Sequence, residues 1–421
     1  MEMDITNIQE ITDLTTRGCG VNADADALVY RAPKVLTPIP GTLWHGKIGR
    51  ANALVRLPTA SHWNGKLLIA ATPAVRNEYS MDLLLSDIAL QLGYAYAACD
   101  KATPGLTLRD PSRGMGEWEK VHLDLVHFAT QLTEQKYGRL PTYRYISGVS
   151  NGGYVTRFML ERHPNLFDGG VEWEGVLWRK EGRHLLTTLA DYVANYPIYC
   201  NWRGDWTQHE RMAAYQRLLS AGLHPASEPH WQRYFLTYWV ISLWLYGFQL
   251  DPQWEPFQRP WSNEWLSHPE SIASYPWQER LDQMALQIAP LENSGKIGKP
   301  PLSVAGNEDC LVPFSYHAKD YAKLVANAGA GARHRSYEIS FGNHVDGLLR
   351  KNRGRQQPVQ PFYEAALLHL ENWVEHGIEP PNAGCYTSIQ DFAPNVSLFS
   401  NVDINESDTQ VVTKLKEVPS E

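Results

Sequence analysis

The chain has 421 residues, of which 43% are hydrophobic and 20% are charged, as expected of a globular protein that can bury a large core. Its formal net charge of −8, with no basic patch in the sequence, argues against nucleic acid or an acidic membrane surface as a partner. The five cysteines are widely spaced and form no Cys-x-x-Cys pair, so the sequence predicts neither a zinc site nor a disulfide framework.

Residues 1–177 are predicted to form the first part of an α/β core. The N-terminal sequence MEMDITN has neither a basic region nor an apolar segment, so we expect no signal peptide and a cytoplasmic protein. Apolar runs predict strands at 28–30, 53–57, 67–71 and 93–99. Residues 118–137 carry apolar side chains on one helical face, which predicts an amphipathic helix against the sheet.

The most informative segment is 148–152, with the sequence Gly-Val-Ser-Asn-Gly. The run 143–146 before it predicts a strand, and the apolar spacing after it predicts a helix. Gly-x-Ser-x-Gly between a strand and a helix is typical of the sharp elbow that exposes a nucleophilic serine. Its glycines permit a tight turn, because they have no Cβ where the backbone is crowded. We therefore predict that Ser150 is a nucleophile and that the Asn151 N–H faces an oxyanion.

Residues 178–292, after a further strand near 170–174, are predicted to be a helical lid inserted into the core. This segment is longer than a minimal sheet needs before its next strand, and such sheets bind ligands at the strand ends. Helical patterns fit 208–221, 228–248 and 276–288, and ten of the 15 tryptophans fall in the lid. The uncharged run 234–250 is at the lower edge of a membrane span, but its polar side chains favour a buried helix. The aromatic residues predict a tightly packed lid, a deep pocket for a bulky or aromatic group, or both.

The second part of the core is predicted at 293–380, and it supplies an acid and a base. Asp309 follows the apolar run 302–305, and His344 follows the run 336–341. A serine, an acid and a histidine in this order, each after a strand, predict a catalytic triad. In it His344 would take the proton of the serine, and Asp309 would orient the imidazole.

The core is predicted to end with a helix at 362–376, and residues 381–421 are predicted to form an irregular tail.

Other residues could fill the roles of acid and base. Glu308 and Asp346 could each replace Asp309 as the orienting acid. Glu174 ends the strand after the elbow helix, from which some hydrolases take their acid. His317 is a rival base, but the helical spacing predicts that it lies inside a helix and faces solvent.

These motifs resemble those of the α/β-hydrolase superfamily over about residues 45–175 and 295–375. The segments 56–70 and 148–153, with Asp309-x-x-Val-Pro, are similar to the tannase, feruloyl-esterase and hydroxybutyrate-oligomer hydrolase branch. The resemblance implies a mostly parallel sheet flanked by helices, serine-esterase activity, and no metal or organic cofactor. Tannase-type members join cysteines next to the serine and the histidine in a disulfide. Val149 and Val345 stand at those places here, so that bridge is absent.

In this superfamily the second oxyanion donor comes from the loop after the 67–71 strand. That loop, 72–79, lacks the His-Gly-Gly stretch of lipases, and Pro73 has no N–H to give. Ala74 is therefore the predicted second donor. Arg76 either binds a carboxylate of the substrate or is a solvated loop arginine. Trp178 and Trp239 of the lid are the candidate substrate contacts.

The sequence thus predicts a serine hydrolase that cleaves small-molecule carboxylic esters with a bulky or aromatic group through an acyl-enzyme. The same triad could act as an amidase or peptidase, or as an acyltransferase that passes the acyl group to another acceptor. An α/β-hydrolase scaffold could also bind a ligand without turnover. The aromatic lid could offer a surface for a homo-oligomer.

Overall fold

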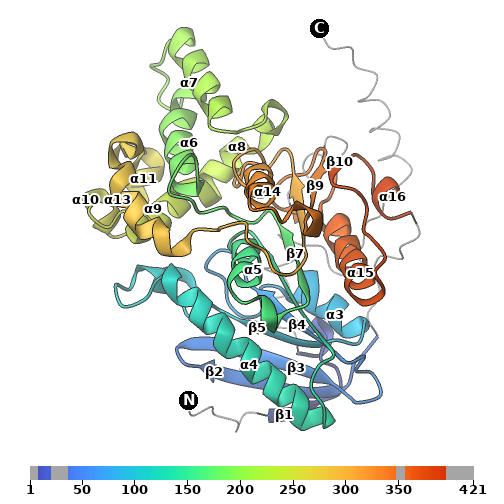
Figure 1. The fold of residues 1–421 in the computed structure, drawn as a ribbon. Helices are drawn as coiled ribbons and strands as arrows, with labels where there is room; N and C mark the ends of the chain where they lie inside the picture. Colours follow the sequence, from blue (N-terminus) through green and yellow to red (C-terminus); the bar gives the residue numbers. More distant parts are fainter. Residues whose placement is uncertain (1–7, 20–36, 348–355, 395–421) are drawn as a thin grey trace.

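One mixed β-sheet forms the centre of the protein in the computed structural model, which describes residues 8–19, 37–347 and 356–394 (Figure 1). Within these ranges the sheet has ten strands in the order β1-β2-β3-β5-β4-β6-β7-β8-β9-β10. The pairs from β1 to β5 are antiparallel and all later pairs are parallel, which confirms the predicted, mostly parallel sheet. The strands are β1 (Ile8–Ile11), β2 (Gly41–Ile48), β3 (Ala51–Pro58), β4 (Lys66–Ala71), β5 (Ala95–Cys99), β6 (Tyr143–Val149), β7 (Gly169–Trp173), β8 (Pro301–Gly306), β9 (Arg335–Ile339) and β10 (Gly384–Tyr386).

The central strands are buried on both faces. Along β4, Leu67 and Ile69 belong to one apolar core, whereas Leu68 and Ala70 belong to the core on the opposite face. A strand covered on both faces needs apolar side chains in both directions, so its sequence is a continuous apolar run. This is why the sequence predicted β4, β5 and β6 more readily than the edge strand β1 and its neighbour β2.

Helices cover both faces of the sheet. On the face toward the viewer in Figure 1 lie α4 (Trp118–Tyr137) and α5 (Asn151–Arg162), which share an apolar core with the sheet. On the other face lie α3 (Asp87–Gln91) and α15 (Gln360–His376). The predicted helix at 118–137 is confirmed, and Gly138 ends it in the left-handed conformation, with φ 71°. The remaining helices of the core are α1 (Thr16–Cys19), η1 (Asp82–Ser86), η2 (Gly105–Arg109), η3 (Met115–Glu117), η4 (Pro164–Leu166), α14 (Ala318–Asn327), η9 (Gly331–Arg333) and α16 (Ile389–Phe392).

Between β7 and β8 the described chain is helical and forms a separate group, upper left in Figure 1. Its helices are α6 (Leu185–Tyr199), α7 (Gln208–Ser220), η5 (Pro225–Ser227), α8 (Glu228–Tyr234), η6 (Phe235–Trp239), α9 (Val240–Leu250), α10 (Glu255–Gln258), α11 (Glu264–Ser267), α12 (Glu270–Ala273), η7 (Trp277–Arg280), α13 (Leu281–Ile288) and η8 (Ala289–Leu291). The sequence had not predicted α6. Eleven of its 15 residues are buried, so it carries no simple apolar stripe. That this group acts as a lid stays a prediction.

The two ends of the chain can be compared with the predictions only in part. Residues 384–392, predicted to be irregular, contain β10 and α16, because β10 pairs in parallel with β9 and Phe392 packs in the core under α15. The predicted strand at 28–30 and the tail beyond 394 lie outside the described residues. In the described ranges, no helix is both long and apolar enough to cross a bilayer.

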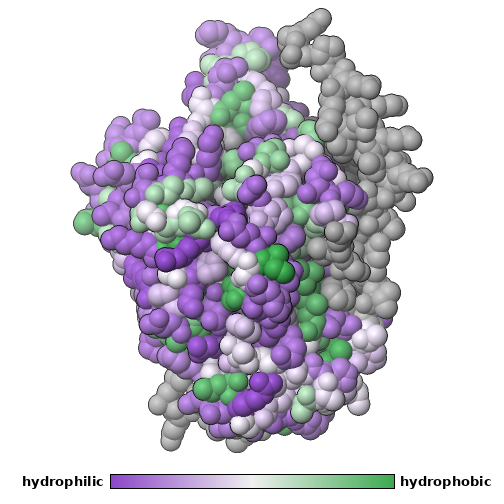
Figure 2. Space-filling model, turned by 45° about the vertical axis from the view of Figure 1, so that its right-hand side comes forward, coloured by the Kyte–Doolittle hydropathy of each residue, from purple (hydrophilic) through white to green (hydrophobic). Residues whose placement is uncertain are grey.

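The molecular surface in Figure 2 is mostly hydrophilic on the face shown, with apolar residues scattered in small groups. Exposed large apolar side chains occur far apart in the sequence; Leu106, Leu286 and Ile378 are examples. Single exposed apolar residues of this kind are ordinary for a globular protein.

Candidate active site

Ser150 stands at a strained turn between β6 and α5. Its φ of 58° and ψ of −117° are unfavourable for any residue with a Cβ, and such strain persists only where the surroundings enforce it. The Ser150 N–H donates to the Trp173 carbonyl at 2.9 Å. A Cβ on Gly152 would stand 1.9 Å from the Ala71 carbonyl oxygen, so this position requires glycine. The structure therefore has the elbow that the sequence motif predicted.

Asn151 begins α5, a helix of twelve residues, so its N–H lies where the helix dipole favours negative charge. Its side chain is held as well, because Nδ2 donates to the Tyr246 hydroxyl of α9 at 2.6 Å. The helical insertion thus contacts the elbow directly. Tyr246 could not be predicted from the sequence, because the pattern of residues does not indicate which face of α9 meets α5.

The loop after β4 contains Ala74, the predicted second oxyanion donor, in a strained conformation with φ 41°. Its neighbour Val75 accepts a hydrogen bond from the Gly105 N–H at 2.7 Å. The start of the loop is held by Lys101, whose Nζ donates to the Thr72 carbonyl at 2.6 Å and to the Thr72 hydroxyl at 2.7 Å. The role of Ala74 as an oxyanion donor stays a prediction.

Lys101 is a buried cation that the sequence analysis missed. It is fully buried, and Nζ lies 5.3 Å from the centre of the Trp118 ring. Burial disfavours the charged form and lowers the pKa of Lys101 to about 8. Its position directly after the β5 strand was the available signal, since polar residues at the carboxyl ends of parallel strands meet at one edge of the sheet.

Asp309 and His344 are brought together by the loops that follow β8 and β9. His344 Nδ1 lies 2.7 Å from Asp309 Oδ2, and both side chains are buried. The other carboxylate oxygen of Asp309 accepts the N–H groups of Leu311 and Val312 at 2.6 and 2.7 Å. These two hydrogen bonds hold the carboxylate in place before any substrate binds.

Asp309 and His344 each stabilise the charged form of the other. Burial by itself raises the pKa of Asp309, but His344 and the backbone N–H groups outweigh it, so the pKa is lowered. Burial by itself lowers the pKa of His344, but the Asp309 and Glu174 carboxyl groups outweigh it, so the pKa is raised. The site therefore favours an ionised aspartate beside an imidazole that holds a proton readily.

A second carboxyl group, that of Glu174, reaches the same histidine. Its Oε2 lies 2.9 Å from His344 Nδ1, and its Oε1 accepts the Gly306 N–H at 2.8 Å. Two atoms bound to one tetrahedral zinc ion would lie about 3.3 Å apart, given metal–ligand distances of about 2.0 Å. The contacts of Asp309 and Glu174 with Nδ1 are shorter, so they are direct contacts between the side chains.

The structure separates the other candidate acids and bases from this site. Glu308 faces Gln356, whose Nε2 donates to it at 3.4 Å. Asp346 accepts the N–H groups of Val359 and Gln360 at 2.9 Å and so holds the start of α15. The prediction that His317 faces solvent is wrong: it is buried at the start of α14 and accepts the Leu177 N–H at 2.9 Å.

Ser150 lies at the same edge of the sheet as the acid and the base, because the parallel strands β6, β8 and β9 all end there. Ser150 and His344 are buried, at 6% and 5% exposure. Among the hydrogen bonds of the described residues, none joins the Ser150 hydroxyl to His344. Hydrogen bonds between catalytic groups are often long in unliganded enzymes and tighten in the substrate complex.

The candidate substrate contacts of the insertion are fully buried. Trp178 packs against His184 and Tyr246, each with its ring centre 6.0 Å away. Trp239 donates its indole N–H to the Cys310 carbonyl at 2.8 Å and so ties η6 to the loop that carries the acid. A substrate could touch either ring only after the insertion moves, and their role in binding stays a prediction.

Arg76, the remaining candidate, lies half-buried after β4 and within electrostatic range of Tyr238 in η6. Its role in substrate binding also stays a prediction.

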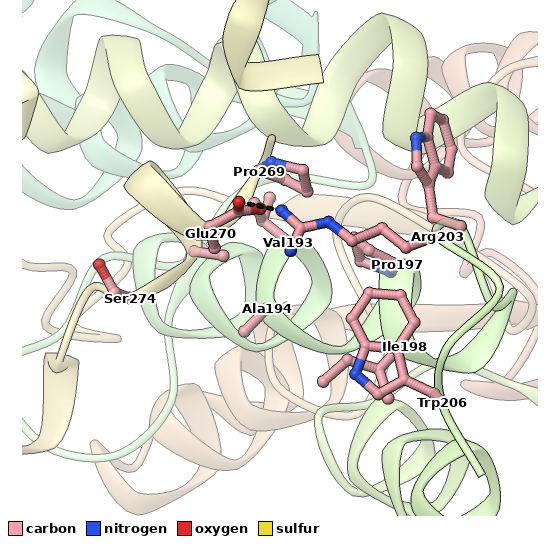
Figure 3. Close-up of a pocket in the computed structure, with 11 residues that line it drawn as sticks. Val193, Ala194, Pro197, Ile198, Arg203, Trp206, Pro269, Glu270 and Ser274 are labelled. Carbon is pink, nitrogen blue, oxygen red and sulfur yellow. Dashed lines mark hydrogen bonds and ion pairs between the residues drawn. The ribbon is translucent and has the colours of Figure 1, made fainter. Parts of the chain in front are cut away.

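A separate cavity of about 250 Å³ lies within the helical insertion (Figure 3). Val193 and Pro197 of α6 and the ring of Trp206 line it, and an ion pair between Arg203 and Glu270 borders it. None of the triad residues lines this cavity, so it is distinct from the site at the strand ends.

No family model and no curated protein matches the sequence. Solved structures do match the fold. Feruloyl esterase B from Aspergillus oryzae superposes with a TM-score of 0.56 at 14% identity, covering 90% of this chain and 89% of that chain. An esterase from the same organism gives 0.53 at 15% identity, covering 90% and 88%. Tannin acyl hydrolase from Aspergillus niger gives 0.52 at 13% identity, covering 100% and 96%.

At these identities the likeness shows the fold, and that fold is the α/β-hydrolase fold. The resemblance of the sequence motifs to feruloyl esterases and tannase is confirmed at this level. All five cysteines are free thiols in the structure.

Proposed function

We propose that the protein is a serine hydrolase that cleaves carboxylic esters through Ser150, His344 and Asp309. The observation that carries the proposal is the pairing of two features at one edge of the sheet. One is the strained turn that holds Ser150 between β6 and α5, and the other is the 2.7 Å contact of His344 with Asp309. Strain at a serine is costly, so its presence at the sheet edge that also carries an acid and a base favours catalysis over packing.

The geometry supports a definite order of proton transfers. Because Nδ1 of His344 contacts Asp309, Nε2 is the nitrogen left to accept the Ser150 proton. The serine oxygen then attacks the ester carbonyl, and His344 returns the proton to the leaving alcohol. Water next attacks the acyl-enzyme with His344 again acting as base, which releases the acid and restores the serine.

Backbone N–H groups would stabilise the negative charge of each tetrahedral intermediate by donating hydrogen bonds to it. The Asn151 N–H at the start of α5 is the first donor, and the Ala74 N–H is proposed as the second. Lys101 supports this arrangement by holding the Thr72 carbonyl, which fixes the start of the loop that presents Ala74.

The proposed substrates are esters with a bulky or aromatic group. Two structures with this fold are named feruloyl esterase and tannin acyl hydrolase. The aromatic helices of the insertion, which reach the elbow through Tyr246, favour a flat apolar substrate group. Feruloyl and other aryl-acid esters are therefore the first compounds to test.

The test is hydrolysis of p-nitrophenyl and aryl-acid esters by the wild type, by Ser150→Ala, and by the control Ser61→Ala at an exposed serine. We expect Ser150→Ala to lose several orders of magnitude in kcat, as removal of a nucleophile does, and the control to keep full activity. Thermal unfolding would verify that both variants fold. Equal activity of Ser150→Ala and wild type would refute the proposal. A panel that includes amides and added alcohol would separate hydrolysis from amidase and acyl-transfer activity.

A further inference from the structure

The imidazole of His344 contacts two carboxyl groups, although a triad needs only one. Asp309 comes from the loop after β8 and Glu174 from the residue directly after β7, so the two reach the ring from neighbouring strands. Glu174 is itself strained, with φ 51°, and is 1% exposed. The fold thus places a carboxyl group here although the backbone conformation is strained and burial disfavours a charge.

Two carboxylates in contact within a buried site cannot both be ionised, because their repulsion is not screened by water. Asp309 is the one that the surroundings favour as the anion, since it accepts two backbone N–H groups in addition to the histidine. Among the backbone N–H groups of the described residues, Glu174 accepts one, that of Gly306. Burial, and then repulsion from Asp309, raise the pKa of Glu174 well above 4.5, which agrees with a neutral acid.

A buried oxygen of Glu174 is placed to hold the proton. Oε2 is enclosed and accepts no hydrogen bond from any described residue, although His344 Nδ1 is 2.9 Å away. Buried oxygens without a partner are rare in native proteins. If Oε2 carries the proton, it donates to the adjacent Asp309 carboxylate. Oε2 then has a hydrogen-bond partner.

Glu308, the chain neighbour of Asp309, changes charge near neutral pH, because burial raises the pKa of its carboxyl group to about 6. The other groups packed around this pair keep their charge there. Burial raises the pKa values of Tyr192 and Tyr234 well above 10 and raises that of Cys310, so all three stay neutral. Burial lowers the pKa of His317 to about 3, so it is neutral too. The charges of Arg157 and Glu172 cancel in a buried ion pair. The charge in contact with His344 is therefore set by Asp309 and Glu174, and the Glu308→Gln variant separates the titration of Glu308 from theirs.

We propose that Glu174 is a second positioning acid of the triad: it holds a proton that it donates to Asp309, and it stands ready beside His344 Nδ1. This inference deepens the proposed function and rests on it. One negative charge is then spread over two carboxyl groups. His344 remains able to act as a base, because a second full negative charge would bind its proton too tightly.

A Glu174 that shares its proton with Asp309 affects the Asp309→Asn variant in a way that a merely structural glutamate would not. In a triad, replacing the acid by asparagine costs about 10⁴ in kcat, because the imidazole takes the wrong tautomer. In Asp309→Asn of this protein, the repulsion on Glu174 is gone, so Glu174 can ionise and accept the Nδ1 proton. The correct tautomer survives, and the loss should be only about 10- to 100-fold.

The experiment compares four variants by the pH profile of kcat/KM on the best aryl ester: Glu174→Gln, Asp309→Asn, the double variant, and Glu308→Gln. Glu308→Gln is the matched control, because this buried neighbour of Asp309 faces Gln356 instead. We expect the ascending limb of the profile to stay at the same pH in Glu174→Gln, since this change replaces a neutral acid by a neutral amide. We expect Asp309→Asn to gain activity as the pH rises and Glu174 ionises. The double variant should fall by about 10⁴ at every pH.

Equal activities of Asp309→Asn and the double variant over the whole pH range would overturn the inference. So would a shift of the ascending limb by more than about one pH unit in Glu174→Gln, because it would mean that Glu174 is an anion in the wild type. Should Asp309→Asn fail to fold, infrared difference spectra of wild type against Glu174→Gln at pH 7 decide the matter through a protonated-carboxyl band. Ser150→Ala tests the proposed function separately, since it removes activity whatever the role of Glu174.

Discussion

Replacing Arg157 by methionine should destabilise the protein more than almost any other single change near the site. The guanidinium and the Glu172 carboxylate are both fully buried, and Nε and Nη2 reach Oε1 at 3.0 and 2.5 Å. Nη1 also donates to the Gly175 carbonyl at 2.8 Å, and the Gly175 N–H donates to Glu172 at 2.7 Å. The pair therefore holds the turn that directly follows Glu174.

The magnitude follows from what remains after the change. Arg157→Met keeps much of the apolar volume but leaves the Glu172 charge buried without a partner, which costs about 3–5 kcal/mol. In Arg157→Met/Glu172→Gln neither charge remains, and the loss should shrink to about 1–2 kcal/mol, because a buried pair contributes little net stability. The double variant should thus be more stable than the single one.

Urea unfolding followed by circular dichroism measures these differences. Arg259→Met is the control: it breaks an ion pair with Glu255 of similar length, 2.6 Å, but both side chains are more than half exposed. We expect the control to leave stability almost unchanged, because exposed pairs are screened by water. A loss below about 1 kcal/mol in Arg157→Met, or a double variant no more stable than the single one, would refute the reasoning.

Three further outcomes are expected. In the wild type, Lys101 releases its proton at about pH 8 when folded but near 10.5 when unfolded, so this group makes stability rise with pH between those values. Thermal unfolding of Lys101→Met across this range should lack that rise, and an unchanged slope would contradict the assignment. Tyr246→Phe leaves the Asn151 amide without its acceptor, which should cost about 1–3 kcal/mol in urea unfolding; no loss would mean that the bond is unimportant. The ascending limb of wild-type kcat/KM should lie above pH 6.5, because contact with Asp309 raises the pKa of His344 against the effect of burial; a midpoint below 6.5 would argue against His344 as the base.

The sequence was sufficient where structure is decided locally. The elbow at Ser150 needs a strand, two glycines and a helix within a short segment, so the motif predicted the turn. Strands β4, β5 and β6 contribute residues to the cores on both faces and therefore appear as apolar runs. The order of Ser150, Asp309 and His344 along the chain predicted the meeting of acid and base, because parallel strands end at one edge.

Sequence reasoning failed where the outcome depends on which distant surfaces pack together. His317 was expected in solvent and is buried, because α14 begins against the turn after β7, where Leu177 donates to it. Helix α6 was missed, since a helix covered on nearly all sides has no apolar stripe to detect. Residues 384–392 were expected to be irregular, but β9 offered a free edge that β10 could join.

The sequence by itself determined the type of fold, the elbow and the identity of the nucleophile candidate, because each depends on neighbours within a few residues or on the periodicity of one element. Only the tertiary structure decided the charge state of the site. Lys101, Glu174 and Asp309 are ordinary charged residues in the sequence, and they become a buried cation and a proton-sharing acid pair through contacts between separate strand ends. Burial and proximity set the energy of a charge, and neither can be read from a linear pattern.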